Sequence, residues 1–110
     1  MNKQIVLGIV FVTLTGSAFA NQLHDKVSAM KESGRRTFTS LLVRQSGAEC
    51  PAVQRTFFQG MLEKNAVWNV SCGTKNNYGI VFYDDEANTT RVMTCPALKE
   101  LGAPNCFKKF

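Results

Sequence analysis

The stretch that decides the fold is AVWNVSCGTKNNYGIVFY, residues 66–83, in which two runs rich in β-branched and aromatic residues flank a polar connection. In the first run Trp68 and Val70 alternate with Asn69 and Ser71, which is the two-residue period of a strand with one buried face. The Gly-Thr-Lys-Asn-Asn connection is short enough to join antiparallel neighbours. We therefore predict a β-hairpin with one apolar face and one wetter face.

Two further runs of the same character extend this hairpin, one over residues 53–60 and one over residues 90–95. Residues 61–65 and 84–88 are equally short connections, and each joins two neighbouring runs. The simplest arrangement of such runs is a four-stranded antiparallel meander.

A helical segment precedes the strands. Residues 22–46 carry apolar side chains at three- and four-residue intervals with an interruption at Ser33–Gly34, so we predict two helical pieces or one kinked helix. This N-terminal helix is the only element expected to cover the buried face. A short helical turn is predicted over residues 97–101. The predicted fold class is α+β, with the helix packed on the four-stranded antiparallel meander.

The first twenty residues predict a cleaved signal peptide. Lys3 provides a positive charge, residues 5–14 an apolar stretch, and Ala18-Phe19-Ala20 a small-x-small cleavage pattern. A transmembrane helix is the alternative, but the apolar run is shorter than the roughly 20 residues that a bilayer requires. We expect cleavage before Asn21, a bacterial periplasmic or secreted location, no stable membrane span, and one small domain over residues 21–110.

The chain has four cysteines, Cys50, Cys72, Cys95 and Cys106. An even number of cysteines in an exported chain predicts two disulfides. No C-x-x-C is present, which disfavours a redox pair, and a single histidine cannot complete a zinc site. Three of the cysteines fall at one end of a meander, so more than one pairing is within reach. Of these we predict Cys50–Cys72 and Cys95–Cys106, both as structural bridges.

The second half of the chain also carries a recognisable pattern, which covers about residues 48–110. It consists of Cys50-Pro51-x-Val53-x-Arg55-Thr56-Phe57-Phe58-Gln59-Gly60, then Trp68-Asn69-Val70-Ser71-Cys72, Tyr78, Cys95 and Cys106-Phe107. This pattern resembles a group of small exported proteobacterial proteins of unknown function. The resemblance implies export and disulfides, and it brings no site residues with it.

The sequence offers few parts for catalysis. His24 is the only histidine, and no nucleophile with a known signature accompanies it, so we expect an ordinary surface histidine. Asp84, Asp85 and Glu86 could supply paired carboxylates or a weak calcium site, but adjacent acids in a hairpin connection are usually turn formers. We expect no catalytic residue, no cofactor and no metal. A small secreted hydrolase or toxin built around His24 is the alternative.

A binding function has more support, because two connections of a meander emerge at the same end of the sheet. Residues 61–65 and 84–88 together hold half of the acidic residues beside two apolar ones. We call this surface the tip, and its residues are Met61, Leu62, Glu63, Asp84, Asp85 and Glu86. We predict a non-enzymatic binding or inhibitory module whose tip enters a basic cleft of an envelope or extracellular protein. The alternative is that Met61 and Leu62 fold back as the edge of the core.

Basic residues outnumber acidic ones. Without Lys3, 12 Lys and Arg face 8 Asp and Glu, a net charge of +4. The basic residues are scattered along the sequence, which disfavours nucleic acid as a partner. A solvated surface is the simplest explanation, with attraction to anionic envelope surfaces as the alternative. We expect a monomer, with Lys75 and Lys108–Lys109 at the end of the sheet opposite the tip.

Overall fold

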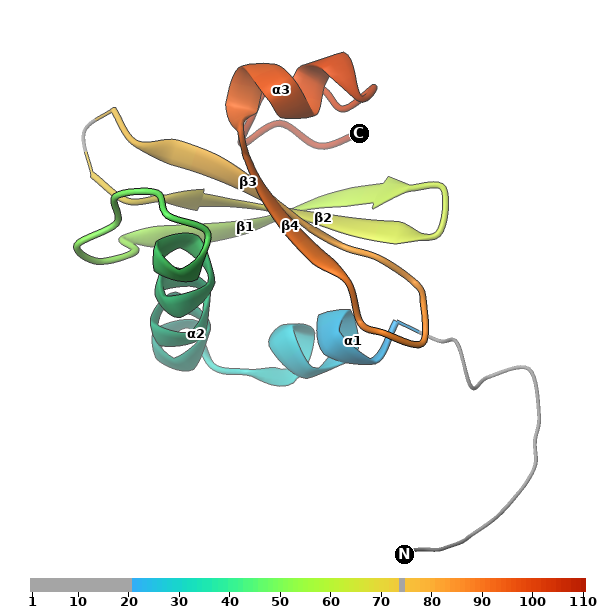
Figure 1. Ribbon diagram of the computed structural model, residues 1–110, viewed down its shortest axis with the longest axis horizontal. Coiled ribbons are helices and arrows are strands. Elements are labelled where there is room, and N and C mark those ends of the chain that lie inside the picture. Colours follow the sequence, from blue (N-terminus) through green and yellow to red (C-terminus); the bar gives the residue numbers. More distant parts are fainter. Residues whose placement is uncertain (1–20, 74) are drawn as a thin grey trace, which may run out of the picture.

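The computed structural model describes residues 21–73 and 75–110, so the predicted signal peptide lies outside the described residues. Three helices and four strands follow one another along this part of the chain (Figure 1). They are α1 (Gln22–Ala29), α2 (Glu32–Gln45), β1 (Arg55–Leu62), β2 (Asn65–Ser71), β3 (Asn77–Phe82), β4 (Thr90–Thr94) and α3 (Cys95–Glu100). Among these helices none is long and apolar enough to cross a bilayer.

The strands form the predicted antiparallel meander, in the order β1-β2-β3-β4. β2 pairs along its length with β1 on one side and with β3 on the other. The register of β1 against β2 shifts between Phe58 and Gly60, which makes Gln59 the extra residue of a β-bulge. The bulge reverses the alternation of side chains in the last part of β1, so that Met61 lies opposite Ala66.

The two N-terminal helices lie on one face of the sheet (Figure 1). The helical segment breaks at Met30–Lys31, where ψ is 150° and 158°, and not at Ser33–Gly34 as predicted. Arg35 stabilises the break, because its guanidinium donates to the carbonyls of Val27 (3.1 Å), Ser28 (3.3 Å) and Met30 (2.7 Å). Val27 and Ser28 lie in the last turn of α1 and Met30 is its C-cap, where helices leave carbonyls without intrahelical partners.

The core between these helices and the sheet is apolar. From the helices, Val27 and Val43 are fully buried, and from β3, Ile80 and Phe82 are fully buried. Trp68 and Val70 of β2 complete this layer, as the alternation of β2 predicts. A second apolar cluster lies on the opposite face of the sheet and joins β2 and β3 to α3, through Val67, Val81, Leu98 and Ala103.

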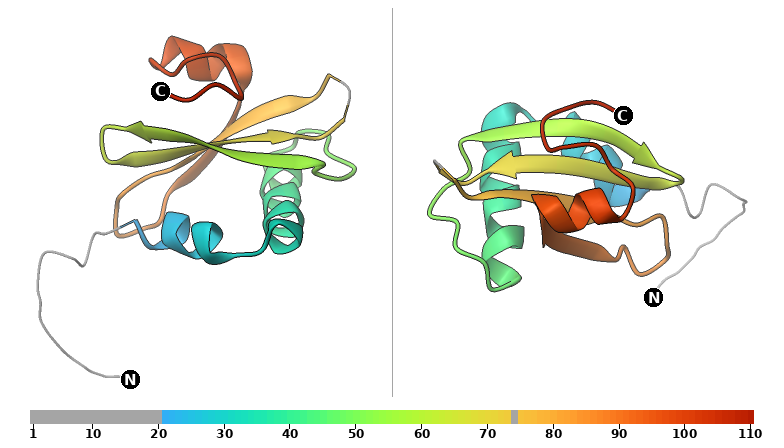
Figure 2. Two further views of the ribbon diagram at one scale, coloured as in Figure 1. Left: turned by 180° about the vertical axis from the view of Figure 1, so that it is seen from behind. Right: turned by 90° about the horizontal axis from the view of Figure 1, so that it is seen from above.

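The prediction that this opposite face is wet is therefore wrong. α3 and residues 103–110, which we call the tail, cover it (Figures 1 and 2). Asn69, expected to face water, has no exposed surface. Gly79 allows this close approach, because a Cβ atom at Gly79 would lie 2.5 Å from Cδ2 of Leu98 in α3. The sheet is thus the middle of three layers.

Both predicted disulfides are present. The Cα atoms of Cys50 and Cys72 lie 5.0 Å apart, and those of Cys95 and Cys106 lie 5.8 Å apart. The first bridge ties the segment after α2 to the end of β2, and the second ties the tail to the start of α3. In the described residues no cysteine is left free.

Candidate functional site

The two connections of the predicted tip lie side by side. Leu62 pairs with Asn65, and the next residue of β2 pairs with the last residue of β3, so both turns leave the same end of the sheet. The side-chain Oδ1 of Asn65 accepts a hydrogen bond from the backbone N–H of Asp84 at 3.1 Å, which links the two turns directly. Glu63 adopts a left-handed conformation with φ of 58°, as a tight two-residue turn requires.

The residues of the tip differ in exposure. Met61 is 43% exposed, and Glu63, Asp85 and Glu86 are also exposed, whereas Asp84 is half-buried. Leu62 packs against the cluster beneath α3, so this residue forms the edge of the core. The bulge explains the difference, because it places Met61 and Leu62 on opposite faces of β1.

Asp85 organises the longer of the two turns. Its carboxylate accepts from the backbone N–H of Thr89 at 2.8 Å, and its carbonyl accepts from Asn88 at 3.1 Å. Hydrogen bonding to Thr89 lowers the pKa of Asp85 and keeps it charged. Asp85 is therefore a turn former that also presents negative charge.

His24 is not the ordinary surface histidine that the sequence predicts. Its Nδ1 accepts the indole N–H of Trp68 at 3.0 Å, and its ring lies 4.9 Å from that of Phe58. Burial lowers the pKa of His24, and the neighbouring Asp25 carboxylate offsets part of this effect. His24 therefore packs as a neutral ring whose Nδ1 is already occupied by a structural hydrogen bond.

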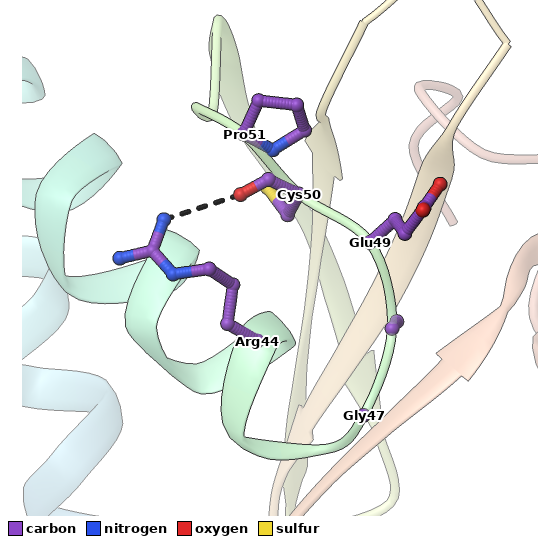
Figure 3. A pocket seen from close by; sticks show the side chains of 6 residues that line it. Arg44, Gly47, Glu49, Cys50 and Pro51 are labelled. Atoms are coloured by element: carbon purple, nitrogen blue, oxygen red, sulfur yellow. Dashed lines mark hydrogen bonds between the residues drawn. The ribbon is translucent and has the colours of Figure 1, made fainter.

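A shallow hollow of about 480 Å³ lies where α2 ends (Figure 3). It is lined by Arg44, Gly47, Ala48, Glu49, Cys50 and Pro51. The guanidinium of Arg44 donates to the carbonyl of Cys50 at 3.1 Å, and Glu49 points away from it. Within residues 21–73 and 75–110, neither this hollow nor any other place brings together three His, Cys, Asp or Glu side chains that could hold a metal ion.

A pair of buried amides fastens the tail to the sheet, and the sequence reasoning missed it. Asn69 Nδ2 donates to Gln59 Oε1 at 3.0 Å, and neither side chain is exposed. Gln59 Nε2 donates to the carbonyls of Pro104 (3.0 Å) and Asn105 (2.9 Å), while Asn69 Oδ1 accepts from the N–H of Phe107 (2.7 Å). Each oxygen and nitrogen atom of the two amides thus has at least one hydrogen-bond partner, as the stability of buried polar groups requires.

The tail then runs along β1. The N–H of Phe110 donates to the carbonyl of Gln59 at 3.2 Å, and Figure 2 shows the tail passing over β1 in the view from above. The prediction that Lys108–Lys109 lie at the end of the sheet opposite the tip is therefore wrong.

The sequence did contain one signal for the buried amide pair. An amide at Asn69, in the middle of an otherwise apolar strand, needs hydrogen-bond partners if both faces of the sheet are covered.

Cations and aromatic rings alternate where the tail meets β1. Arg55 lies over the rings of Phe107 (4.5 Å) and Phe57 (5.4 Å). Lys109 lies over the rings of Phe57 (5.4 Å) and Phe58 (4.8 Å). This arrangement interleaves basic and aromatic side chains in space, although they are scattered in the sequence.

Comparison with known proteins adds no residue roles to this geometry. No family model matches the chain, and no curated protein and no solved structure gives a match.

Proposed function

We propose that this protein is a small exported binding or inhibitory module, and that the tip is the surface that contacts its protein partner. The observation that carries the proposal is the hydrogen bond between Asn65 and Asp84, which joins two turns into one surface. Export itself rests on the signal-peptide pattern of residues 1–20 and is compatible with the two disulfides.

Packing and hydrogen bonds hold both turns of the tip in place. Leu62 anchors one turn against α3, and Asp85 closes the other turn through Thr89. A surface held in this way loses little conformational entropy when it binds, which favours affinity. Met61 is the apolar residue that the tip leaves exposed for contact.

The negative charge of the tip favours a partner with a basic surface. Glu63, Asp85 and Glu86 are exposed carboxylates, so the complementary surface is a basic cleft or groove on another protein. Complementary charge of this kind accelerates association and excludes acidic surfaces.

The alternative, a hydrolase or toxin centred on His24, has less support. A general base needs an unprotonated nitrogen that can reach a substrate. Nδ1 of His24 accepts from the buried Trp68, and in the neutral ring Nε2 then carries the proton. We therefore do not place a reaction at His24.

The test is capture of a partner from envelope extract by immobilised protein, expressed with its own leader and purified in the oxidised form. The tip variant combines Glu63→Gln, Asp85→Asn and Glu86→Gln, which removes three charges and keeps an acceptor for Thr89. The matched control combines Asp25→Asn, Glu49→Gln and Glu100→Gln, which removes three charges elsewhere. We expect a partner to be retained by the wild type and the control and lost by the tip variant.

Two results would contradict the proposal. Equal capture by the tip variant and the wild type would mean that another surface is used. Capture of no protein under any condition would mean that the tip has no protein partner in the envelope.

A further inference from the structure

A second surface of different character lies along β1. We call it the tail surface, and its residues are Arg55, Phe57, Phe107, Lys108, Lys109 and Phe110. The three cations are exposed, and Phe110 is 50% exposed. Both salt bridges of the described residues are made by Glu32, so these cations are not neutralised by an ion pair there.

The tail surface is held rigidly. The buried amides of Gln59 and Asn69 bind the backbone of the tail at three points, and the Cys95–Cys106 disulfide fixes its middle. Phe110 is fixed at the other end, because its N–H bonds to β1 and its ring lies against Gly60, where a Cβ atom would approach it to 2.8 Å. The tail is thus fastened to the sheet along its length.

Phe107 adopts an unfavourable backbone conformation. Its φ is 67°, in the left-handed region that residues with a Cβ rarely occupy. The hydrogen bond from its N–H to Asn69 holds this conformation, in which the ring lies beside that of Phe57 and beneath the guanidinium of Arg55. Strain of this kind concentrates at surfaces with a function.

From these observations we propose that the tail surface binds the surface of a bilayer that contains anionic phospholipid. Exposed lysine and arginine are attracted to such a surface, and aromatic rings settle at the level of the headgroups. The tail surface presents three cations and three phenylalanines together, with Phe110 the most exposed of the rings. Charge complementarity and exposed aromatic area therefore point to the same occupant.

The probe is binding to sedimented vesicles of phosphatidylglycerol and phosphatidylcholine, with vesicles of phosphatidylcholine alone as the reference. Each cation removed from such a surface weakens binding about fivefold, so the double variant Arg55→Ala/Lys108→Ala should bind about 25-fold more weakly than the wild type. The matched double variant Lys26→Ala/Lys31→Ala removes two charges from the helical layer and should bind within about threefold of the wild type, because charges on the far side of the molecule are screened.

A third variant, Phe110→Ser, separates the aromatic contribution from charge. We expect it to weaken vesicle binding several-fold while the dependence of binding on salt stays unchanged. Fluorescence of the buried Trp68 reports whether each variant keeps its fold, so a lost fold is distinguished from a lost surface.

The alternative ligand is a soluble anionic polymer, and heparin is its probe. Binding of heparin without binding of anionic vesicles would overturn the proposal in favour of a polymer. Equal vesicle binding by the tail-surface variant and the helical-layer variant would overturn it as well, since the charge would then act without a defined site. Release of the vesicles by inorganic phosphate, where sodium chloride of the same ionic strength does not release them, would identify the phosphate group alone as the ligand and would also overturn the proposal.

Discussion

Trp68 donates its indole N–H to Nδ1 of His24, and this bond joins α1 to the central strand of the sheet. The bond requires that Nδ1 carry no proton, so protonation of His24 breaks it. Burial already lowers the pKa of His24 in the folded protein below its value in the unfolded chain, which is about 6.5.

The first prediction follows from this shift. Above pH 7 the ring is neutral in both states, but below about pH 6.5 the unfolded chain takes up a proton more readily than the folded protein. We expect the free energy of unfolding to fall as the pH is lowered from 7.5 through 6, before carboxylates titrate. Urea unfolding followed by Trp68 fluorescence measures this. His24→Gln keeps an acceptor for Trp68, and its stability should vary less over this range; an unchanged pH dependence would exclude His24 as the cause.

The second prediction concerns Glu32, which protects the outer edge of β1. Its carboxylate accepts from the N–H (3.2 Å) and hydroxyl (2.6 Å) of Thr56, and it pairs with Arg36 at 3.1 Å. Burial alone would raise the pKa of Glu32, but hydrogen bonds from Thr56 and Arg36 outweigh it and lower the pKa. Because the carboxylate is partly exposed, we expect Glu32→Gln to cost only about 1 kcal/mol at pH 7. This cost should disappear at pH values below the lowered pKa, where the wild type is protonated; Glu100→Gln is the control and should be close to neutral.

The third prediction concerns the buried amides. Asn69→Ala leaves the N–H of Phe107 and the Oε1 atom of Gln59 without partners, and each buried polar group left unpaired costs about 1–3 kcal/mol. We expect a loss of about 2–4 kcal/mol in chemical denaturation. Faster hydrogen exchange at Phe107 than in β3 would localise the effect to the tail. A loss below 0.5 kcal/mol, typical of exposed sites, would show that the pair is replaceable by water.

The fourth prediction concerns the contact between Gly79 and Leu98. A methyl group at Gly79 collides with the Leu98 side chain, so Gly79→Ala should cost about 1–3 kcal/mol through overpacking. Leu98→Ala should cost about 2–5 kcal/mol through the cavity it leaves. In the double variant the added methyl group partly fills the cavity, so the loss in free energy of unfolding should be smaller than the sum of the two single losses. Additive losses in a double-mutant cycle would mean that α3 does not rest on Gly79.

The sheet and its disulfides could be predicted because they depend on local signals. Each strand shows its own two-residue alternation, and short connections leave an antiparallel meander as the simplest topology. That topology in turn places Cys50 within reach of Cys72. The position of the tip follows from the same geometry, since alternate turns of a meander share one end.

The rest depended on contacts between distant residues. Asn69 has the alternation of an exposed residue, and its burial is favourable only because the side chain of Gln59 and the N–H of Phe107 supply hydrogen-bond partners. The bulge at Gln59 is marked in the sequence only by the adjacent Gly60, although it decides that Leu62 is partly buried and Met61 exposed. The packing role of His24 likewise depends on its contact with Trp68, which lies 44 positions away in the sequence.

The bond between Phe110 and Gln59 also sets an order of events during synthesis. β1 emerges from the ribosome well before the tail, so its outer edge stays uncovered there until residue 110 has been made. An uncovered edge strand is a template for pairing with other chains. Because disulfides form after export in an oxidising compartment, the chain stays exposed to aggregation until the tail docks there, and slow formation of the Cys95–Cys106 bridge should lengthen that vulnerable interval.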